Sequence, residues 1–123
     1  MQFMTLIKPA GDFGPPPAAL MDAMTKAREA ATTDAKVVAT GRLAAIAAAT
    51  RVRISNGKVT VTDGPFTESK EVVASYAVLE VKSKEEAIEA ARWLMEQFVE
   101  FWPGWQGETE VRQILSPADH PQA

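Results

Sequence analysis

The tetrapeptide Ser55–Asn56–Gly57–Lys58 constrains the fold of this 123-residue chain more than any other feature. Asn-Gly favours a type I′ two-residue turn, because both central residues of that turn need a positive φ. The turn fixes a hairpin register in which Ile54 faces Val59 and Val52 faces Val61. These four aliphatic side chains then share one face of the hairpin, and the opposite face carries Arg51, Arg53, Thr60 and Thr62.

Four other segments have the composition and alternation of β-strands. Phe3–Lys8 carries apolar groups on both faces, and Val73–Lys82 alternates in the same way. Lys36–Thr40 is short and β-branched, and we expect Gly41 to break it. Thr109–Leu115 is the last predicted strand.

Two segments have the period of amphipathic helices. Pro15–Pro17 suits the entrance to the first helix, which we expect to end at Thr32–Asp34. Ser83–Glu86 is a capping-box sequence that opens the second helix, and Pro103–Gly104 ends it. The apolar stripe of this second helix consists of Ala87, Ile88, Ala91, Leu94, Met95 and Phe98.

The order of the elements predicts an α+β fold, namely a ferredoxin-like βαβ(ββ)βαβ arrangement with an inserted hairpin. Two helices cover only one face of such a sheet, and the other face keeps apolar groups such as Val78, together with Tyr76. A chain this small with a half-apolar uncovered face is expected to form a homodimer. We assign residues 1–116 to a single domain and residues 117–123 to a flexible C-terminal tail.

The composition excludes several kinds of chemistry. The chain has no cysteine and one histidine, His120, so we expect no disulfide framework, thiolate nucleophile, metal site or cofactor. Thirteen basic and sixteen acidic residues give a net charge of −3, which argues against a nucleic-acid partner. Since no run approaches the roughly 18 apolar residues of a membrane span, we expect no membrane partner and a cytoplasmic protein.

The segment Val61–Thr62–Asp63–Gly64–Pro65–Phe66–Thr67–Glu68–Ser69–Lys70–Glu71 resembles the YCII-related family, specifically the branch named for its DGPF motif. The resemblance continues in Met1–Lys8, Gly41–Leu43, Ser83–Ala91 and Glu110–Arg112. It implies a dimeric α+β barrel, in which two ferredoxin-like subunits pack sheet to sheet. Some YCII-like relatives are thought to act as lyases or dehydrochlorinases through a His–Asp pair. This chain has no histidine outside its tail, so that mechanism does not carry over.

Asp63 is the best candidate for a catalytic residue, because a partly buried carboxylate at the end of a strand can serve as a general acid or base. The structural alternative is an Asx-turn, in which Asp63 accepts backbone N–H groups and Gly64 supplies an unusual φ. Phe66 is expected to fill the core. The charged side chains of Glu68, Lys70 and Glu71 would clamp a polar ligand, form a solvated loop or make an ion pair across the dimer.

Arg53, Arg112 and Tyr76 join Asp63 as candidate ligand-binding residues. An arginine facing a cavity can hold a carboxylate or phosphate in a bidentate grip, although Arg112 would instead form a structural ion pair if it met Asp63. Tyr76 would donate a hydrogen bond inside the barrel or act as an interface aromatic. Trp102 and Trp105 would roof a pocket or cover the end of the core.

These residues favour a protein that binds or transforms a small molecule in a pocket at the sheet face and dimer interface. Asp63 would supply acid or base catalysis of a lyase- or isomerase-like kind. The alternative is a non-catalytic interaction or regulatory protein, since members of the DGPF branch are often encoded beside alternative sigma factors. A heme or quinol handler is disfavoured because the chain lacks a well-placed histidine.

Overall fold

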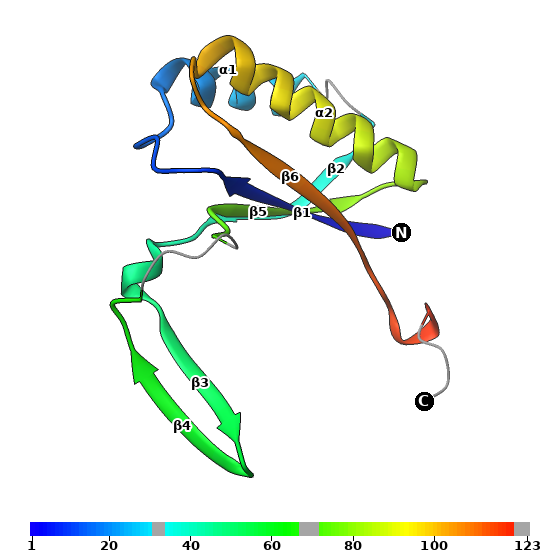
Figure 1. The fold of residues 1–123 in the computed structure, drawn as a ribbon. Coiled ribbons are helices and arrows are strands. Elements are labelled where there is room, and N and C mark those ends of the chain that lie inside the picture. The colour runs from blue at the N-terminus through cyan, green and yellow to red at the C-terminus, as the bar shows by residue number, and fades with distance from the viewer. Residues whose placement is uncertain (31–33, 67–71, 120–123) are drawn as a thin grey trace.

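The structure is a computed structural model that describes residues 1–30, 34–66 and 72–119. It confirms the α+β fold, with two helices on one face of an antiparallel sheet (Figure 1). The elements are β1 (Gln2–Pro9), α1 (Ala18–Glu29), β2 (Lys36–Arg42), β3 (Thr50–Ser55), β4 (Lys58–Asp63), β5 (Ser75–Glu80), α2 (Lys84–Phe101) and β6 (Gly107–Ile114). Two short 3₁₀ turns, η1 (Ile46–Ala48) and η2 (Pro117–Asp119), complete the described chain.

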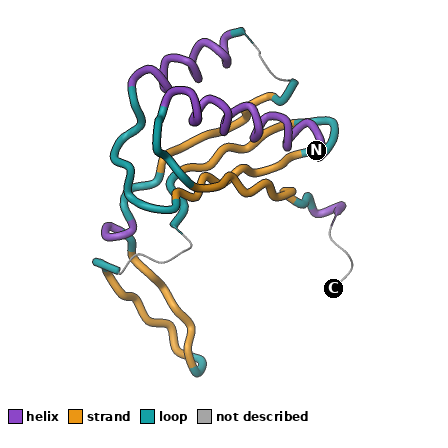
Figure 2. The backbone as a smooth tube through the Cα atoms, turned by 45° about the horizontal axis from the view of Figure 1, so that its top comes forward, coloured by secondary structure: helices purple, strands orange, loops and turns teal. Residues whose placement is uncertain are grey.

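The four-stranded sheet has the order β2-β5-β1-β6, and each neighbouring pair is antiparallel. With α1 and α2 packed on one face, this is the ferredoxin-like arrangement. β3 and β4 pair only with each other and form the inserted hairpin, which we call the arm (residues 50–63). Figures 1 and 2 show the helices on one side of the sheet and the arm extending away from the other side.

The hydrophobic core lies between the helices and the sheet. Alternation along β1 and β5 turns Phe3 and Leu79 toward α2, where they form a buried cluster with Val81 and Ala87. Leu20 on α1 is 1% exposed and is the largest fully buried side chain of the described residues. The centre of this face of the sheet is therefore buried within one chain.

The capping box predicted at the second helix is present. The Ser83 hydroxyl accepts a hydrogen bond from the backbone N–H of Glu86 at 3.3 Å, and α2 begins at Lys84. The Glu86 carboxylate accepts the backbone N–H of Lys82 at 2.9 Å, one residue before the amide that a standard box would use. These two hydrogen bonds fix the segment after β5 against the start of α2.

The arm has the predicted register, with Ile54 opposite Val59 and Val52 opposite Val61. Asn56 and Gly57 have φ values of 52° and 76°, as a type I′ turn requires. Turn chemistry and alternation were sufficient here because the two strands are adjacent in the sequence.

The boundary predicted at Gly41 was wrong, because β2 continues through this residue to Arg42. Gly41 lies opposite Tyr76 of β5, and a Cβ atom at Gly41 would come within 2.9 Å of the Tyr76 ring. The glycine therefore makes room for an aromatic ring from the neighbouring strand, which also compensates for its missing side chain.

Other boundaries differ by a few residues. The strand predicted over 73–82 is Ser75–Glu80, and the first helix ends at Glu29, before the predicted stop at Thr32–Asp34. Thr32 and Thr33 lie outside the described residues. At the C-terminus, Pro117–Asp119 form the η2 turn, whereas His120 and the rest of the predicted tail lie outside the described residues.

Candidate functional site

The face of the sheet opposite the helices carries an apolar strip beside a charged cluster. We call it the open face, and it is formed by Met4, Leu6, Lys8, Tyr76, Val78, Glu110 and Arg112. The apolar members are half-buried. In the register of the sheet, Met4 lies between Val78 and Arg112, and Leu6 lies between Tyr76 and Glu110. Apolar and charged side chains are thus adjacent across three neighbouring strands.

Two cations flank one carboxylate on the open face. The Lys8 ammonium group donates to Glu110 Oε1 at 2.7 Å, and Arg112 Nε lies 3.5 Å from Glu110 Oε2. The hydrogen bond from Lys8 and the positive charges of Lys8 and Arg112 hold the pKa of Glu110 below its ordinary value, against the opposing effect of desolvation. The side chain of Arg112 is 71% exposed, so most of its guanidinium group faces solvent.

Sequence reasoning missed Lys8 and Glu110. Alternation along 110–112 puts Glu110 and Arg112 on one face of a strand, and this much could have been recognised. The contact with Lys8 joins residues 102 positions apart, and it depends on the pairing of β1 with β6. No local sequence signal specifies that pairing.

A hollow lies at one end of the open face. It is lined by Met1, Gln2, Glu80, Ile114, Leu115 and Ser116. The N-terminal ammonium group of Met1 donates to Glu80 Oε1 at 3.1 Å and to the carbonyl of Val81 at 3.0 Å. Ile114 is two residues after Arg112 on β6, so their side chains point to the same face of the sheet.

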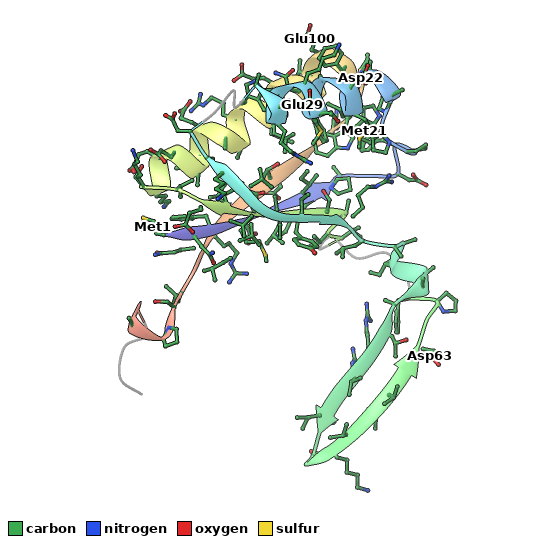
Figure 3. All side chains as sticks on the ribbon, turned by 180° about the vertical axis from the view of Figure 1, so that it is seen from behind. Met1, Met21, Asp22, Glu29, Asp63 and Glu100 are labelled. Atoms are coloured by element: carbon green, nitrogen blue, oxygen red, sulfur yellow. The ribbon has the colours of Figure 1, made fainter. Side chains whose placement is uncertain are left out.

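The structure separates the four predicted ligand-binding residues into two groups. Tyr76 and Arg112 lie on the open face, with β1 between their strands. Asp63 and Arg53 lie on the arm, away from the four-stranded sheet (Figure 3). Asp63 is opposite Thr50 and Arg53 is opposite Thr60, so alternation places these two side chains on opposite faces of the arm. A single copy of the chain therefore does not assemble all four.

Asp63 takes part in a contact that closes the base of the arm. The Thr50 hydroxyl donates to Asp63 Oδ1 at 2.7 Å, and both residues are exposed. The expected Asx-turn is absent, because the residue two positions after Asp63 is Pro65, which has no N–H to donate. The backbone N–H of Gly64 donates instead to the carbonyl of Ala49 at 2.9 Å. The conditional ion pair of Asp63 with Arg112 is also absent, because Arg112 pairs with Glu110 instead.

Gly64 is required for a reason other than an unusual φ. It does not have a positive φ, which corrects that expectation. A Cβ atom at Gly64 would lie 2.5 Å from the carbonyl oxygen of Ala47 and 3.1 Å from that of Ala49. The glycine thus allows the end of β4 to pack directly against the backbone of η1.

Phe66 does not fill the core, contrary to the prediction. Its half-buried ring lies under the guanidinium group of Arg51, 3.8 Å from ring centroid to Cζ. The reason is local, because Arg51 is on β3 beside the base of the arm, and a cation over the ring face is a favourable partner. The predicted charged clamp at Glu68, Lys70 and Glu71 lies outside the described residues.

The aromatic residues after α2 cover one end of the core. Phe98 contacts Trp105 edge to face at 4.8 Å between ring centroids and Trp102 at 5.5 Å. Phe13 joins Trp105 at 6.1 Å. Because Phe98 is only 6% exposed, the cluster fits the core-covering alternative for the two tryptophans.

No group of three or more His, Asp or Glu side chains within the described ranges is placed to hold a metal ion. In that same part of the chain, no helix is long and apolar enough to cross a membrane.

Comparison with known proteins identifies the family. A search of curated proteins finds no significant match. The YCII-related domain, in contrast, matches residues 1–94, which is about three-quarters of the 123-residue chain and includes β1 through β5 and the first part of α2. The ferredoxin-like sheet and the sequence match agree, and the chain belongs to the YCII-related family.

Proposed function

We propose that this chain, as a member of the DGPF branch of the YCII-related family, forms a homodimer that binds a small, partly apolar anion between its subunits. The observation that carries the proposal is the open face, where the exposed guanidinium group of Arg112 adjoins a strip of apolar side chains. This combination suits a ligand with an apolar body and a carboxylate or phosphate at one end.

The homodimer is supported by what a single chain leaves uncovered. Met4, Leu6 and Val78 are only half-buried, and the helices lie on the opposite side of the sheet. Two copies of this face packed across a two-fold axis would bury both strips, since an isologous interface brings the same surface together twice. Packed sheets lie about 10 Å apart, which leaves the ends of the interface open to a small ligand.

Arg112 is the residue that we propose holds the anionic end of the ligand. Glu110 approaches its Nε at 3.5 Å, which leaves the two terminal nitrogens for a second partner. A guanidinium group binds a carboxylate through two parallel hydrogen bonds, and these are stronger than bonds between neutral groups. Tyr76, on the same face, offers a hydroxyl group beside the apolar strip.

Asp63 and Arg53 enter this proposal only from the second copy, because both lie on the arm, which is separate from the four-stranded sheet of their own chain. The Thr50 hydroxyl engages Asp63 Oδ1, so Asp63 Oδ2 is the atom that would accept or deliver a proton in acid–base chemistry. Asp63→Asn keeps the acceptor for Thr50 while removing the carboxylate. It is therefore the variant that separates a chemical role from a structural one.

The binding proposal is tested with benzoate as the probe and benzyl alcohol as its uncharged counterpart. We expect benzoate to shift the NMR resonances of Tyr76 and Val78 saturably, and benzyl alcohol to bind at least tenfold more weakly. Arg112→Gln is expected to weaken benzoate binding at least tenfold, because a hydrogen bond to a charged group contributes about 1.5–3 kcal/mol and 1.4 kcal/mol corresponds to about a factor of ten.

The matched control is Arg92→Gln on the outer surface of α2, where the arginine is 66% exposed and pairs with Glu89. It should bind benzoate as the unsubstituted protein does. Equal binding of benzoate to the Arg112→Gln and unsubstituted proteins, or no shift on the open face at saturating benzoate, would contradict the proposal.

A further inference from the structure

The arm displays an apolar face that nothing in its own chain covers. Val52, Val59 and Val61 are each 66% exposed, and Ile54 is 79% exposed. The hairpin register places all four on one face. A two-stranded hairpin is at best marginally stable alone in water, so an arm with this face solvated needs a second surface. The four side chains therefore mark a docking surface.

We propose that the arm lies against the body of a second copy of this chain and clasps it, with its aliphatic face turned to that copy. By the body we mean the four-stranded sheet together with α1 and α2. The inference rests on the homodimer of the proposed function and adds the arm as a distinct part of its interface. It assigns a role to a hairpin that is separate from both the four-stranded sheet and the core.

The direction and length of the arm fit this role. The arm extends from the side of the sheet that faces away from the helices, which is also the side of the open face (Figures 1 and 3). Each of its strands has six residues, and six residues of β-strand span roughly 20 Å. A partner sheet on the open face would lie about 10 Å away, so the arm reaches past it to its flank.

The area of the arm also fits an addition to a sheet-to-sheet contact. One face of a two-stranded ribbon about 20 Å long covers roughly 200 Å². That is well below the roughly 800 Å² per partner of a stable protein interface. A four-stranded sheet face covers roughly 400–500 Å² by the same spacing. Neither surface is sufficient alone, whereas the two together approach the required size.

The arm and the rest of the chain have net charges of opposite sign. The arm carries Arg51, Arg53 and Lys58 against Asp63, a net charge of +2. The remainder of the chain has ten basic and fifteen acidic residues, a net charge of −5. Arg51, Arg53 and Lys58 lie on the face of the arm opposite the aliphatic one. This difference in net charge therefore draws an arm toward a second body during approach, and it does not form the docked contact itself.

The base of the arm holds it ready for this contact. The Thr50–Asp63 hydrogen bond, the bond from the Gly64 amide to Ala49 and the Arg51–Phe66 contact all lie where β3 and β4 join the rest of the chain. A segment fixed in its docked direction loses less conformational freedom on binding. The DGPF turn thus orients the arm.

The test compares two neighbouring substitutions in the full chain, each of which adds one negative charge to β4. Val61→Asp alters the aliphatic face and Thr62→Asp alters the opposite face. By sedimentation equilibrium, we expect Val61→Asp to raise the dimer Kd at least tenfold and Thr62→Asp to raise it less than threefold. Circular dichroism should show both variants folded, because neither side chain belongs to the core.

A third variant, Val78→Asp on the open face, separates this inference from the proposed function. If Val78→Asp dissociates the dimer and Val61→Asp does not, the clasp is wrong and the sheet interface stands. If only Val61→Asp acts, the clasp stands and the sheet interface is wrong. A chain that is monomeric at all concentrations overturns both.

The position of the arm can be measured directly because the chain has no cysteine. A nitroxide is attached to the cysteine of the Ser55→Cys variant, beside the turn of the arm. This spin-labelled protein is then mixed with the unsubstituted chain, which is enriched in ¹⁵N and has no spin label. We expect intermolecular broadening of resonances from the partner's four-stranded sheet or helices. Broadening confined to the arm of the ¹⁵N-enriched copy, or none at all, overturns the clasp.

Discussion

Two valines in segments of alternating apolar and polar residues differ sharply in their burial. Val81 lies directly after β5, and Val61 lies on the arm. Val81 is 4% exposed and Val61 is 66% exposed. Both segments have the pattern of a half-buried strand, yet only the body of the molecule supplies the surface that buries it. The comparison shows that alternation predicts which side chains share a face and does not predict what covers that face.

The two regions also differ in how they are connected. The arm is closed by a two-residue turn between adjacent strands, and its register follows from local chemistry. The body brings β1 between β5 and β6, so that Ile7 lies opposite Ser75 on one side and opposite Thr109 on the other. The body therefore depends on packing of distant segments, whereas the arm depends on its turn and on its base.

The largest expected effect tests whether the body alone carries the stability of the fold. Leu20→Ala removes a side chain that is 1% exposed, and it should lower the free energy of unfolding by about 2–5 kcal/mol through lost burial and a residual cavity. Leu43→Ala is the control, since Leu43 is 51% exposed and should cost less than about 0.5 kcal/mol. Urea denaturation at one fixed protein concentration measures both. Equal losses would remove the distinction between a covered and an uncovered surface.

The same distinction explains what could be predicted from the sequence. The arm register was predicted pair by pair, and so was the helix start at Ser83, because both depend on residues within a few positions of each other. The ferredoxin-like fold class followed from the order of the elements along the chain. These features need no knowledge of distant contacts.

The candidate site was less predictable for a physical reason. The Lys8–Glu110 pair requires the β1–β6 register, and the role of Gly64 requires the position of the Ala47 carbonyl. Tyr76 over Gly41 likewise depends on which strands pair. Residue type alone identified Asp63 and Arg53 as chemically capable, but it did not reveal that the arm separates them from Tyr76 and Arg112.

A smaller effect is expected at the joint between the two regions. In Gly64→Ala, the new Cβ atom would meet the Ala47 carbonyl oxygen at 2.5 Å, so either η1 or the end of β4 must move. Overpacking of this kind costs about 1–3 kcal/mol. Because the strain lies at the base of the arm, we expect faster hydrogen exchange for the amides of β3 and β4 and unchanged exchange in the body.

The control for this substitution is Gly11→Ala, where a Cβ atom would make only ordinary contact with the Phe13 ring at 3.5 Å. It should leave exchange in the arm unchanged. If Gly64→Ala accelerates exchange in α2 and β1 as much as in the arm, then the two regions unfold together and the joint does not separate them.

The smallest expected effect concerns the charged cluster of the body. The pKa of Glu110 is lowered in the folded chain, first by the hydrogen bond from Lys8. Its contribution to stability is therefore present above the ordinary pKa of a glutamate and is lost as the pH falls through the lower folded value.

The Glu110→Gln variant keeps an acceptor for Lys8 but no longer titrates at this position. The stability of the variant should therefore fall less steeply than that of the unsubstituted protein as the pH is lowered from 6 to 3. Thermal unfolding across that range measures the difference, and 1 M salt should diminish it by screening the exposed Arg112. Parallel acid limbs for the two proteins at low salt would show that the ion pair adds nothing to the body.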